Sequence, residues 1–161
     1  VSDMQMRQRD AQTGLDERLR KFEPMKVSVD GQEIQVEQTE KRDYDAAMDI
    51  FRKGDFAAAQ LSLQRFVQRY PQTGYQPSAL FWLGNASYAV KDYKASLAQF
   101  RQMLTLAPTH ARAPEAMLAI SNVQIELKDT KAARKTLEDL IKAFPQSDAA
   151  QAAKDRLPKL R

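Results

Sequence analysis

The sequence predicts an all-α solenoid of three helix-turn-helix repeats followed by a C-terminal capping helix. Residue types recur at steps of 37, each period holds two amphipathic segments, and 43% of the 161 residues are hydrophobic without a long apolar run. Stacked copies of one such unit bury a continuous core that a single copy cannot form. We therefore expect one repeat domain over residues 40–161, with repeats at about 40–76, 77–113 and 114–147 and the capping helix at 148–160.

Four kinds of residue keep their place across the three copies. An aspartate suits the N-cap of a helix, and a proline suits the turn that follows one. The second helix of each repeat is therefore expected between an aspartate and the next proline. The aligned positions are Asp55, Asp92 and Asp129; Ala58, Ala95 and Ala132; Leu63, Phe100 and Leu137; and Pro71, Pro108 and Pro145.

The first helix of each repeat is expected over residues 41–53, 77–90 and 114–127. Pro77 and Pro114 begin the second and third of these helices, where a missing N–H costs nothing. Small residues recur where the two helices of a repeat would cross, which lets the backbones approach. They are Ala47, Gly84 and Ser121 in the first helices and Ala59, Ser96 and Ala133 in the second helices.

This pattern resembles the tetratricopeptide repeat, a helix-turn-helix unit of about 34 residues. The middle repeat, LFWLGNASYAVKDYKASLAQF, is the best match, although Leu80 stands at the usual Trp position and Trp82 follows two residues later. The longer period implies longer turns between repeats. The segment SDAAQAAKDRLPKLR fits the solvating helix that covers the last apolar face of such an array, with Pro158 fraying its end.

Residues 1–22 are interpreted as the remnant of an N-terminal coiled-coil helix, because apolar residues lie on a heptad grid there. Polar residues at the remaining seam positions would limit this segment to weak self-association. The apolar positions are Met4, Ala11, Leu15 and Phe22, and the polar positions are Gln8 and Arg18.

Residues 23–39 are interpreted as a linker that contains a β-hairpin. The segment MKVSVDGQEIQV places Asp30-Gly31 between two alternating segments, which is the signal for a type I′ turn. A two-stranded hairpin alone is marginal in water, so it must either dock on the repeats or stay partly disordered. The apolar side chains that would share one face are Met25, Val27, Val29, Ile34 and Val36.

Composition excludes several function classes. Without cysteine the chain has no disulfide, thiolate zinc site or cysteine nucleophile, and with one histidine it has no paired-histidine metal site. Acidic and lysine residues scattered over solvated helix faces form no convergent catalytic set, so we expect no enzyme activity, no metal and no cofactor. His110, in the turn after Pro108, is expected to be exposed.

Net charge and hydropathy limit the classes of partner that we expect. The net charge of +4 divides into −3 over residues 1–40 and +7 over residues 41–161. Lysine and arginine alternate with acidic residues in the basic part, which favours a solvated surface over a nucleic-acid face. No apolar run is long enough to span a bilayer, so no direct membrane insertion is expected.

The segment FWLGNASYAVKDY, the count of three repeats and the preceding LRKFEP resemble the C-terminal region of the YbgF family of Tol-Pal-associated division coordinators, also called CpoB. The resemblance implies a periplasmic protein with an upstream signal peptide and a trimerising coiled coil. It further implies binding to TolA and a link from a peptidoglycan synthase complex to outer-membrane constriction during cell division. The alternative is another cell-envelope scaffold, such as an outer-membrane assembly lipoprotein, which would carry a lipidated cysteine and usually more repeats.

A partner is expected on the concave surface that the first helices line in repeats of this type. We expect Phe81, Trp82 and Tyr88 to form a solvent-facing aromatic cluster there, because rigid aromatics bury much area at low entropic cost. The asparagine amides could hold a peptide backbone or play a structural role. The stripe offers no lysine or arginine in the second and third repeats, which favours an internal or helical partner segment over a C-terminal carboxylate. The candidate groove residues are Tyr44, Met48, Phe51, Phe81, Trp82, Asn85, Tyr88 and Asn122.

Two aromatic residues of this set have an alternative role, since Tyr44 and Phe51 could cover the N-terminal edge of the array. Tyr75, which lies between Gly74 and Pro77, is expected to fill the turn between the first two repeats and to bind nothing.

Overall fold

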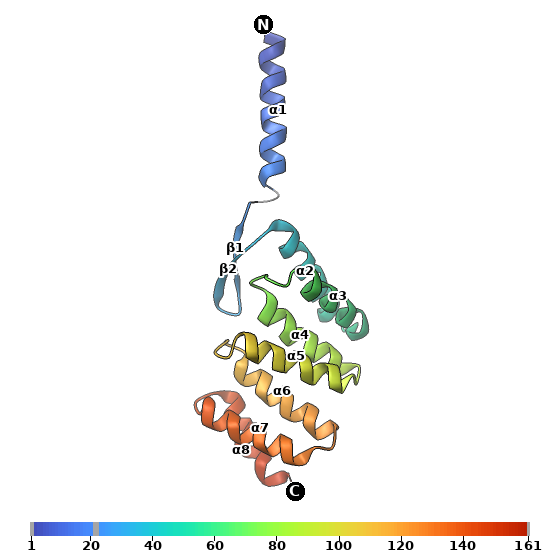
Figure 1. Ribbon diagram of the computed structural model, residues 1–161, viewed down its shortest axis with the longest axis vertical. Helices are drawn as coiled ribbons and strands as arrows, with labels where there is room; N and C mark the ends of the chain where they lie inside the picture. Colours follow the sequence, from blue (N-terminus) through green and yellow to red (C-terminus); the bar gives the residue numbers. More distant parts are fainter. Residues whose placement is uncertain (1, 21–22, 161) are drawn as a thin grey trace.

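The computed structural model describes residues 2–20 and 23–160, and helices stack along its long axis with the two termini at opposite ends (Figure 1). The three repeats are three helix pairs, which confirms the predicted all-α repeat fold. Each helix packs against its neighbours in sequence. The pairs are α2 (Gln38–Arg52) with α3 (Phe56–Arg69), α4 (Gln76–Ala89) with α5 (Tyr93–Leu106), and α6 (Ala113–Glu126) with α7 (Thr130–Ala143).

The aspartates that precede the second helices act as N-caps in two of the three repeats. Asp55 accepts a hydrogen bond from the backbone N–H of Ala58 at 3.2 Å, and Asp129 makes the equivalent bond. Asp92 makes no cap bond with its side chain and instead accepts from Gln60 Nε2 at 3.0 Å. The middle aspartate therefore ties the second repeat to the second helix of the first.

In all three repeats, the residue at the same position after the first helix has a left-handed backbone conformation. Gly54, Lys91 and Lys128, spaced 37 apart, have φ values of 83°, 64° and 62°. The N–H of each bonds to the carbonyl of the residue three positions earlier, at 2.9 to 3.0 Å. Only glycine takes this conformation without steric cost, so the two lysines hold a strained backbone.

The small residues at the helix crossings are all buried, and Gly84 shows why. A Cβ built on Gly84 would lie 2.7 Å from Cζ of Phe100, so the phenyl ring occupies the space that any side chain would need. Ser96 donates a hydrogen bond of 2.7 Å from its hydroxyl to the carbonyl of Gly84. In the middle repeat, the backbone of α4 at Gly84 therefore packs directly against the Phe100 ring of α5.

The capping helix α8 (Asp148–Arg156) begins at Ser147, whose hydroxyl accepts from the N–H of Ala150 at 3.0 Å. It buries its alanine face in the cluster that contains Leu137 and Leu140. A 3₁₀ turn, η1 (Leu157–Lys159), replaces the last helical turn, in agreement with the fraying expected from Pro158.

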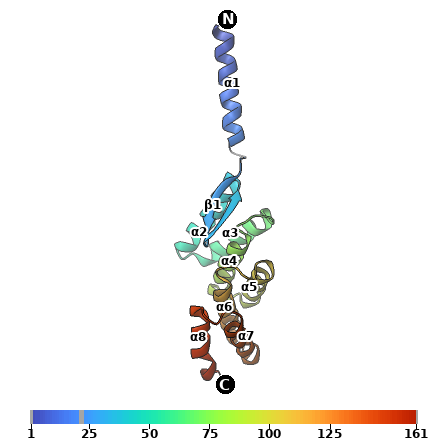
Figure 2. The same ribbon diagram turned by 90° about the vertical axis from the view of Figure 1, so that its left-hand side faces the viewer.

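The N-terminal segment forms a helix, α1 (Ser2–Arg20), which extends away from the repeats (Figures 1 and 2). Its seam residues Met4 and Leu15 are 71% and 51% exposed, while Phe22 lies outside the described residues. No helix among residues 2–20 and 23–160 is long and apolar enough to cross a membrane.

The hairpin docks on the repeats, which is one of the two outcomes that the sequence left open. Strands β1 (Met25–Val29) and β2 (Gln32–Val36) pair antiparallel through a turn at Asp30 and Gly31, whose φ values of 49° and 79° fit type I′. Three of the expected apolar residues pack partly buried against the core of the first repeat, Val36 is buried in it, and Met25 stays exposed. A Cβ on Gly74 would lie 2.9 Å from Cβ of Ile34, so this glycine permits the close approach.

Candidate functional site

The candidate site is the first-helix face, the surface of α2, α4 and α6 that carries the predicted groove residues. Part of this face is closed. Tyr44, Met48 and Phe81 are buried, so the expectation of a solvent-facing Phe81 is wrong. The Phe81 ring, 4% exposed, packs at 5.9 Å from the Phe100 ring and at 4.9 Å from the Trp82 ring. It belongs to the core between the second and third repeats.

The tip of the hairpin covers one end of this face. The Asp30 carboxylate, 11% exposed, accepts a hydrogen bond from the Ser78 hydroxyl on α4 and one of 2.6 Å from Nε of Arg112. Ser78 lies in the first turn of α4 and is fully buried. The chain therefore fills this end of the face with its own aspartate.

Arg112 brings a positive charge onto the part of the face that the second and third repeats form, where no lysine or arginine is expected on the concave stripe. It precedes α6, and its guanidinium lies 4.9 Å from the Trp82 ring centre and 5.4 Å from that of Phe81. Burial lowers the pKa of Arg112, but hydrogen bonds and charges from Asp30 and Glu115 outweigh it and raise the pKa overall. The guanidinium stays charged between a carboxylate and two aromatic faces.

His110 is buried, in contrast to the expected exposed turn residue, with 5% of its surface exposed. Its Nδ1 accepts from the N–H of Arg112 at 3.0 Å, and its Nε2 lies 3.5 Å from the Ser78 hydroxyl and 3.8 Å from the Asp30 carboxylate. The expectation failed because the docked hairpin covers the turn after α5. Sequence spacing carries no signal for a contact between such distant segments.

Tyr75 fills the turn between the first two repeats, as expected, and is 2% exposed. Its ring stacks on that of Tyr44 with centres 4.1 Å apart. Burial raises the pKa of Tyr75 to about 12 and raises the pKa of Tyr44 as well, with the charge of Asp30 adding to the effect on Tyr44. Tyr44 thus packs in the core of the first repeat, against Phe66 and Tyr75.

The remaining predicted residues divide into two groups. Phe51 and Trp82, with rings 5.2 Å apart, line a cavity of about 460 Å³ together with Tyr44, Met48 and residues of β1. Asn85, Tyr88 and Asn122 line a separate cavity of about 100 Å³ between α4 and α6. The structure therefore does not join all eight residues in one groove.

Both asparagines already have partners within the chain. Asn85 donates from Nδ2 to the carbonyl of Phe81 at 3.0 Å, one turn earlier in α4. Asn122 accepts from Arg156 of the capping helix. Each amide keeps further donor or acceptor capacity, and the partly exposed Tyr88 lines the same cavity.

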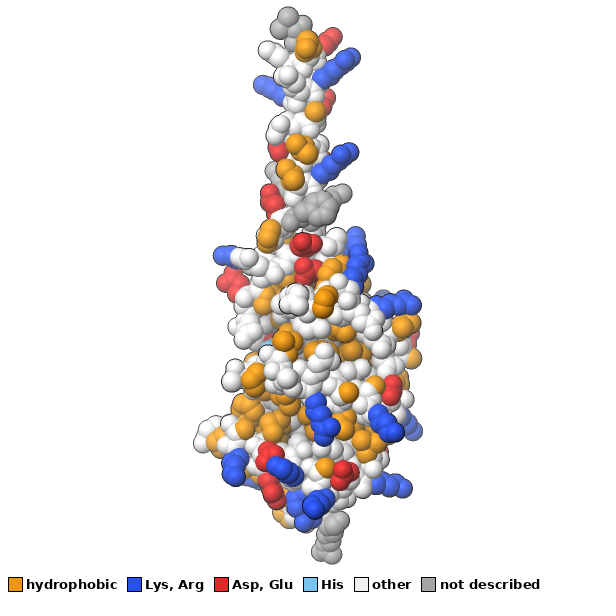
Figure 3. All heavy atoms as spheres, in the orientation of Figure 1, with side chains coloured by type: hydrophobic (Ala, Val, Ile, Leu, Met, Phe, Trp, Pro, Cys, Tyr) orange, Lys and Arg blue, Asp and Glu red, His pale blue; other side chains and the backbone are white. Residues whose placement is uncertain are grey.

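On the surface drawn in Figure 3, apolar side chains gather over the middle of the repeat array, and charges of both signs surround them. No group of three or more His, Asp or Glu side chains in the described ranges could hold a metal ion.

Helix pairs of this geometry define the chain as a tetratricopeptide-type protein. Residues 36–161 match the family model described as YfiO, outer membrane lipoprotein, and the chain belongs to that family. The chain is also similar to the cell division coordinator CpoB of Pseudomonas putida, with 38% identity over 53 residues. That match covers 33% of this chain and spans one fifth (20%) of the relative's length.

Solved structures agree on the fold. The second tetratricopeptide domain of human RPAP3, in complex with an HSP70 peptide, superposes with a TM-score of 0.60 at 15% identity over 73% of this chain and 91% of that one. The tetratricopeptide domain of Arabidopsis OM64 superposes with a TM-score of 0.62 at 12% identity, over 74% of this chain and 94% of that one. PcrH from Pseudomonas aeruginosa superposes with a TM-score of 0.62 at 15% identity, over 78% of this chain and 90% of that one.

Proposed function

We propose that this chain is a non-catalytic periplasmic interaction module that binds a TolA-like partner and serves the link between a peptidoglycan synthase complex and outer-membrane constriction during cell division. The similarity to a cell division coordinator supports the biological setting. The tetratricopeptide fold and the YfiO-family match support a scaffold in the cell envelope.

One observation carries the choice of binding surface. The hairpin fills one end of the first-helix face and Arg156 of α8 reaches the other, which leaves Asn85, Tyr88 and Asn122 around an open cavity at its middle. A partly exposed aromatic between two amides can pack against a partner side chain while the amides bond to its backbone. We assign the partner contact to these three residues.

Titration calorimetry with a TolA-like segment tests this assignment. Tyr88→Ala should weaken binding by about 1 kcal/mol or more, the level of a meaningful hot-spot residue. Lys94→Ala, an exposed change on α5, is the matched control and should leave the affinity within error. If Tyr88→Ala binds like the parent while Arg134→Ala on α7 abolishes binding, the partner uses the outer face and the assignment is wrong.

The family match favours a second candidate, an outer-membrane assembly component. Affinity purification of the tagged full-length protein separates the two candidates. Recovery of Tol-Pal proteins in stoichiometric amounts supports the division role, and recovery of outer-membrane assembly proteins supports the alternative.

We also propose that α1 gives at most weak self-association, because its exposed seam mixes apolar and polar residues. Sedimentation should show that any association of the chain is lost when residues 1–22 are deleted. A tight trimer that survives the deletion would contradict this.

A further inference from the structure

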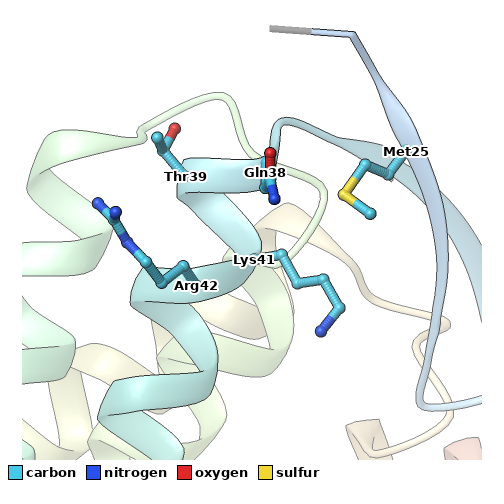
Figure 4. Close-up of a pocket in the computed structure, with 5 residues that line it drawn as sticks. All are labelled: Met25, Gln38, Thr39, Lys41 and Arg42. Atoms are coloured by element: carbon cyan, nitrogen blue, oxygen red, sulfur yellow. The ribbon is translucent and has the colours of Figure 1, made fainter. Parts of the chain in front are cut away.

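A cleft runs along the edge of β1. Two cavities of about 430 and 460 Å³ share Lys41, and they lie between β1 and α2. Figure 4 shows Met25 of β1 on one side of the first cavity and Lys41 and Arg42 of α2 on the other. From β1 the two cavities are lined by Met25 and by Val27, Ser28 and Val29, and no residue of β2 lines either. The cleft therefore follows the side of β1 that faces away from β2.

The backbone of β1 offers hydrogen bonds toward that side. In a two-residue hairpin the pair beside the turn exchanges both hydrogen bonds and the next pair exchanges none. The register pairs Val29 with Gln32 and Ser28 with Glu33, so the N–H and C=O of Ser28 and Lys26 point outward. Within the described ranges, neither residue makes a backbone hydrogen bond on that side.

The walls and floor of the cleft suit an extended chain. Strand positions alternate in direction, so every second side chain of an added strand would face the floor of Tyr44, Met48 and Trp82. The docked hairpin is held at its tip by Asp30, which fixes β1 as a preformed template. A segment that pairs with it gains main-chain bonds without ordering the hairpin first.

The charges of the cleft select an acidic segment. Its basic residues are Lys41, Arg42, Arg52 and Arg112, and its acidic residues are Asp30 and Asp45. Both acids are already paired, Asp45 with Lys41 at 2.6 Å and Asp30 with Arg112 at 2.6 Å. Arg52 and Arg112 also pair with Asp49 and Glu115, each at 3.2 Å, but neither of these acids lines the cleft. The lining itself carries four basic and two acidic side chains, and this excess of positive charge complements carboxylates on the solvent side of an added strand.

We propose that the outer edge of β1 binds an extended, acidic segment of a protein partner as a third strand in this cleft. The inference rests on the proposed function, in that it assigns the partner a second contact on the same face. It requires an apolar side chain at alternate positions of the segment and carboxylates between them.

The test uses the full 161-residue chain and a synthetic probe, the acetylated and amidated peptide Glu-Val-Glu-Val-Glu-Val-Glu. NMR titration should shift the amide signals of Lys26 and Ser28 and slow their hydrogen exchange at least tenfold. The same peptide with lysine in place of glutamate should bind at least tenfold more weakly. Absence of slowed exchange at Ser28 under saturating peptide would overturn the proposal.

A proline pair provides the matched control. Ser28→Pro removes the outward N–H of β1 and should weaken peptide binding at least tenfold, since proline is tolerated on a strand edge only where its N–H faces outward. Glu33→Pro makes the same change on the opposite edge and should leave binding within twofold. Equal loss in both variants, or no loss in either, would contradict binding at β1.

A probe variant keeps the test decisive if Ser28→Pro disturbs the hairpin. N-methylation of the peptide amides that face β1 should abolish binding to the parent chain, and methylation of the alternate amides should not. The proposed function is tested by a different experiment, the binding of the TolA-like segment to the Tyr88→Ala variant. Tyr88 lines another cavity, so the two proposals can fail independently. Peptide shifts at Asn85 and Tyr88 instead of Ser28 would reject the strand site alone.

Discussion

Asp30 and Arg112 lie 82 residues apart in the sequence, yet their side chains meet at 2.6 Å across the first-helix face. The contact joins the hairpin to the start of the third repeat, past the whole of the second. It is a charge-assisted bond with both groups largely withdrawn from solvent. The tip of the hairpin is therefore anchored on the second and third repeats.

Asp30→Asn should destabilise the docked hairpin by about 1.5–3 kcal/mol, the usual range for a hydrogen bond to a charged group. Hydrogen exchange at Val27 and Ile34 should accelerate, while exchange in α7 should not change. Asp45→Asn removes an exposed ion pair and serves as control, with a change below about 1 kcal/mol. A double-mutant cycle of Asp30→Asn with Arg112→Gln that gives no coupling would show that the bond does not hold the hairpin.

Gly84→Ala should lower the free energy of unfolding by about 1–3 kcal/mol, because the added methyl would meet the Phe100 ring. Gly84→Leu should cost at least as much. Urea unfolding measures both. Gly14→Ala is the matched control, since nothing lies within 4 Å of that position and alanine favours an exposed helix. An unchanged midpoint for Gly84→Leu would remove the helix register described here.

Lys91→Gly and Lys128→Gly should each stabilise the domain by about 1 kcal/mol, because glycine relieves the left-handed backbone at these positions. The reverse change, Gly54→Lys, should destabilise by a similar amount. Thermal unfolding of the three variants checks the signs. If both glycine substitutions destabilised the domain, the lysine side chains would stabilise the folded state by more free energy than the backbone strain costs.

Stability should fall as the pH rises from about 10 to about 12. The folded state keeps Tyr75 protonated up to a pKa of about 12, whereas an unfolded tyrosine loses its proton near 10. The unfolded state then binds fewer protons, so the free energy of unfolding decreases with pH, by at most about 1.4 kcal/mol per unit for one residue. Urea titrations at pH 8, 10 and 11.5 measure the slope. Tyr75→Phe should reduce it, and an equal slope in that variant would exclude Tyr75 as the source.

Much of the fold could be predicted because its determinants are local. The step of 37 places the helix crossings at Gly84 and Ser96, and the pair Asp30-Gly31 specifies the hairpin turn. The candidate site was less predictable. Phe81 is buried by the packing of the second repeat on the third. Burial of His110 depends on where the hairpin docks, and the Asp30 carboxylate that meets Ser78 and Arg112 decides that position. Repeat spacing holds no information on such a contact.

The position of the hairpin ahead of its partners has a consequence for synthesis. Asp30 leaves the ribosome before Ser78 and Arg112, and 82 residues separate it from the second of these partners. At about 5–20 residues per second, the wait lasts on the order of 4–16 s. The apolar face of the strands can pack earlier, because the core that receives it extends only to Leu83. Before that point the two strands are an isolated pair of marginal stability. The bond between the hairpin tip and Arg112 therefore forms last, after the middle repeat has emerged.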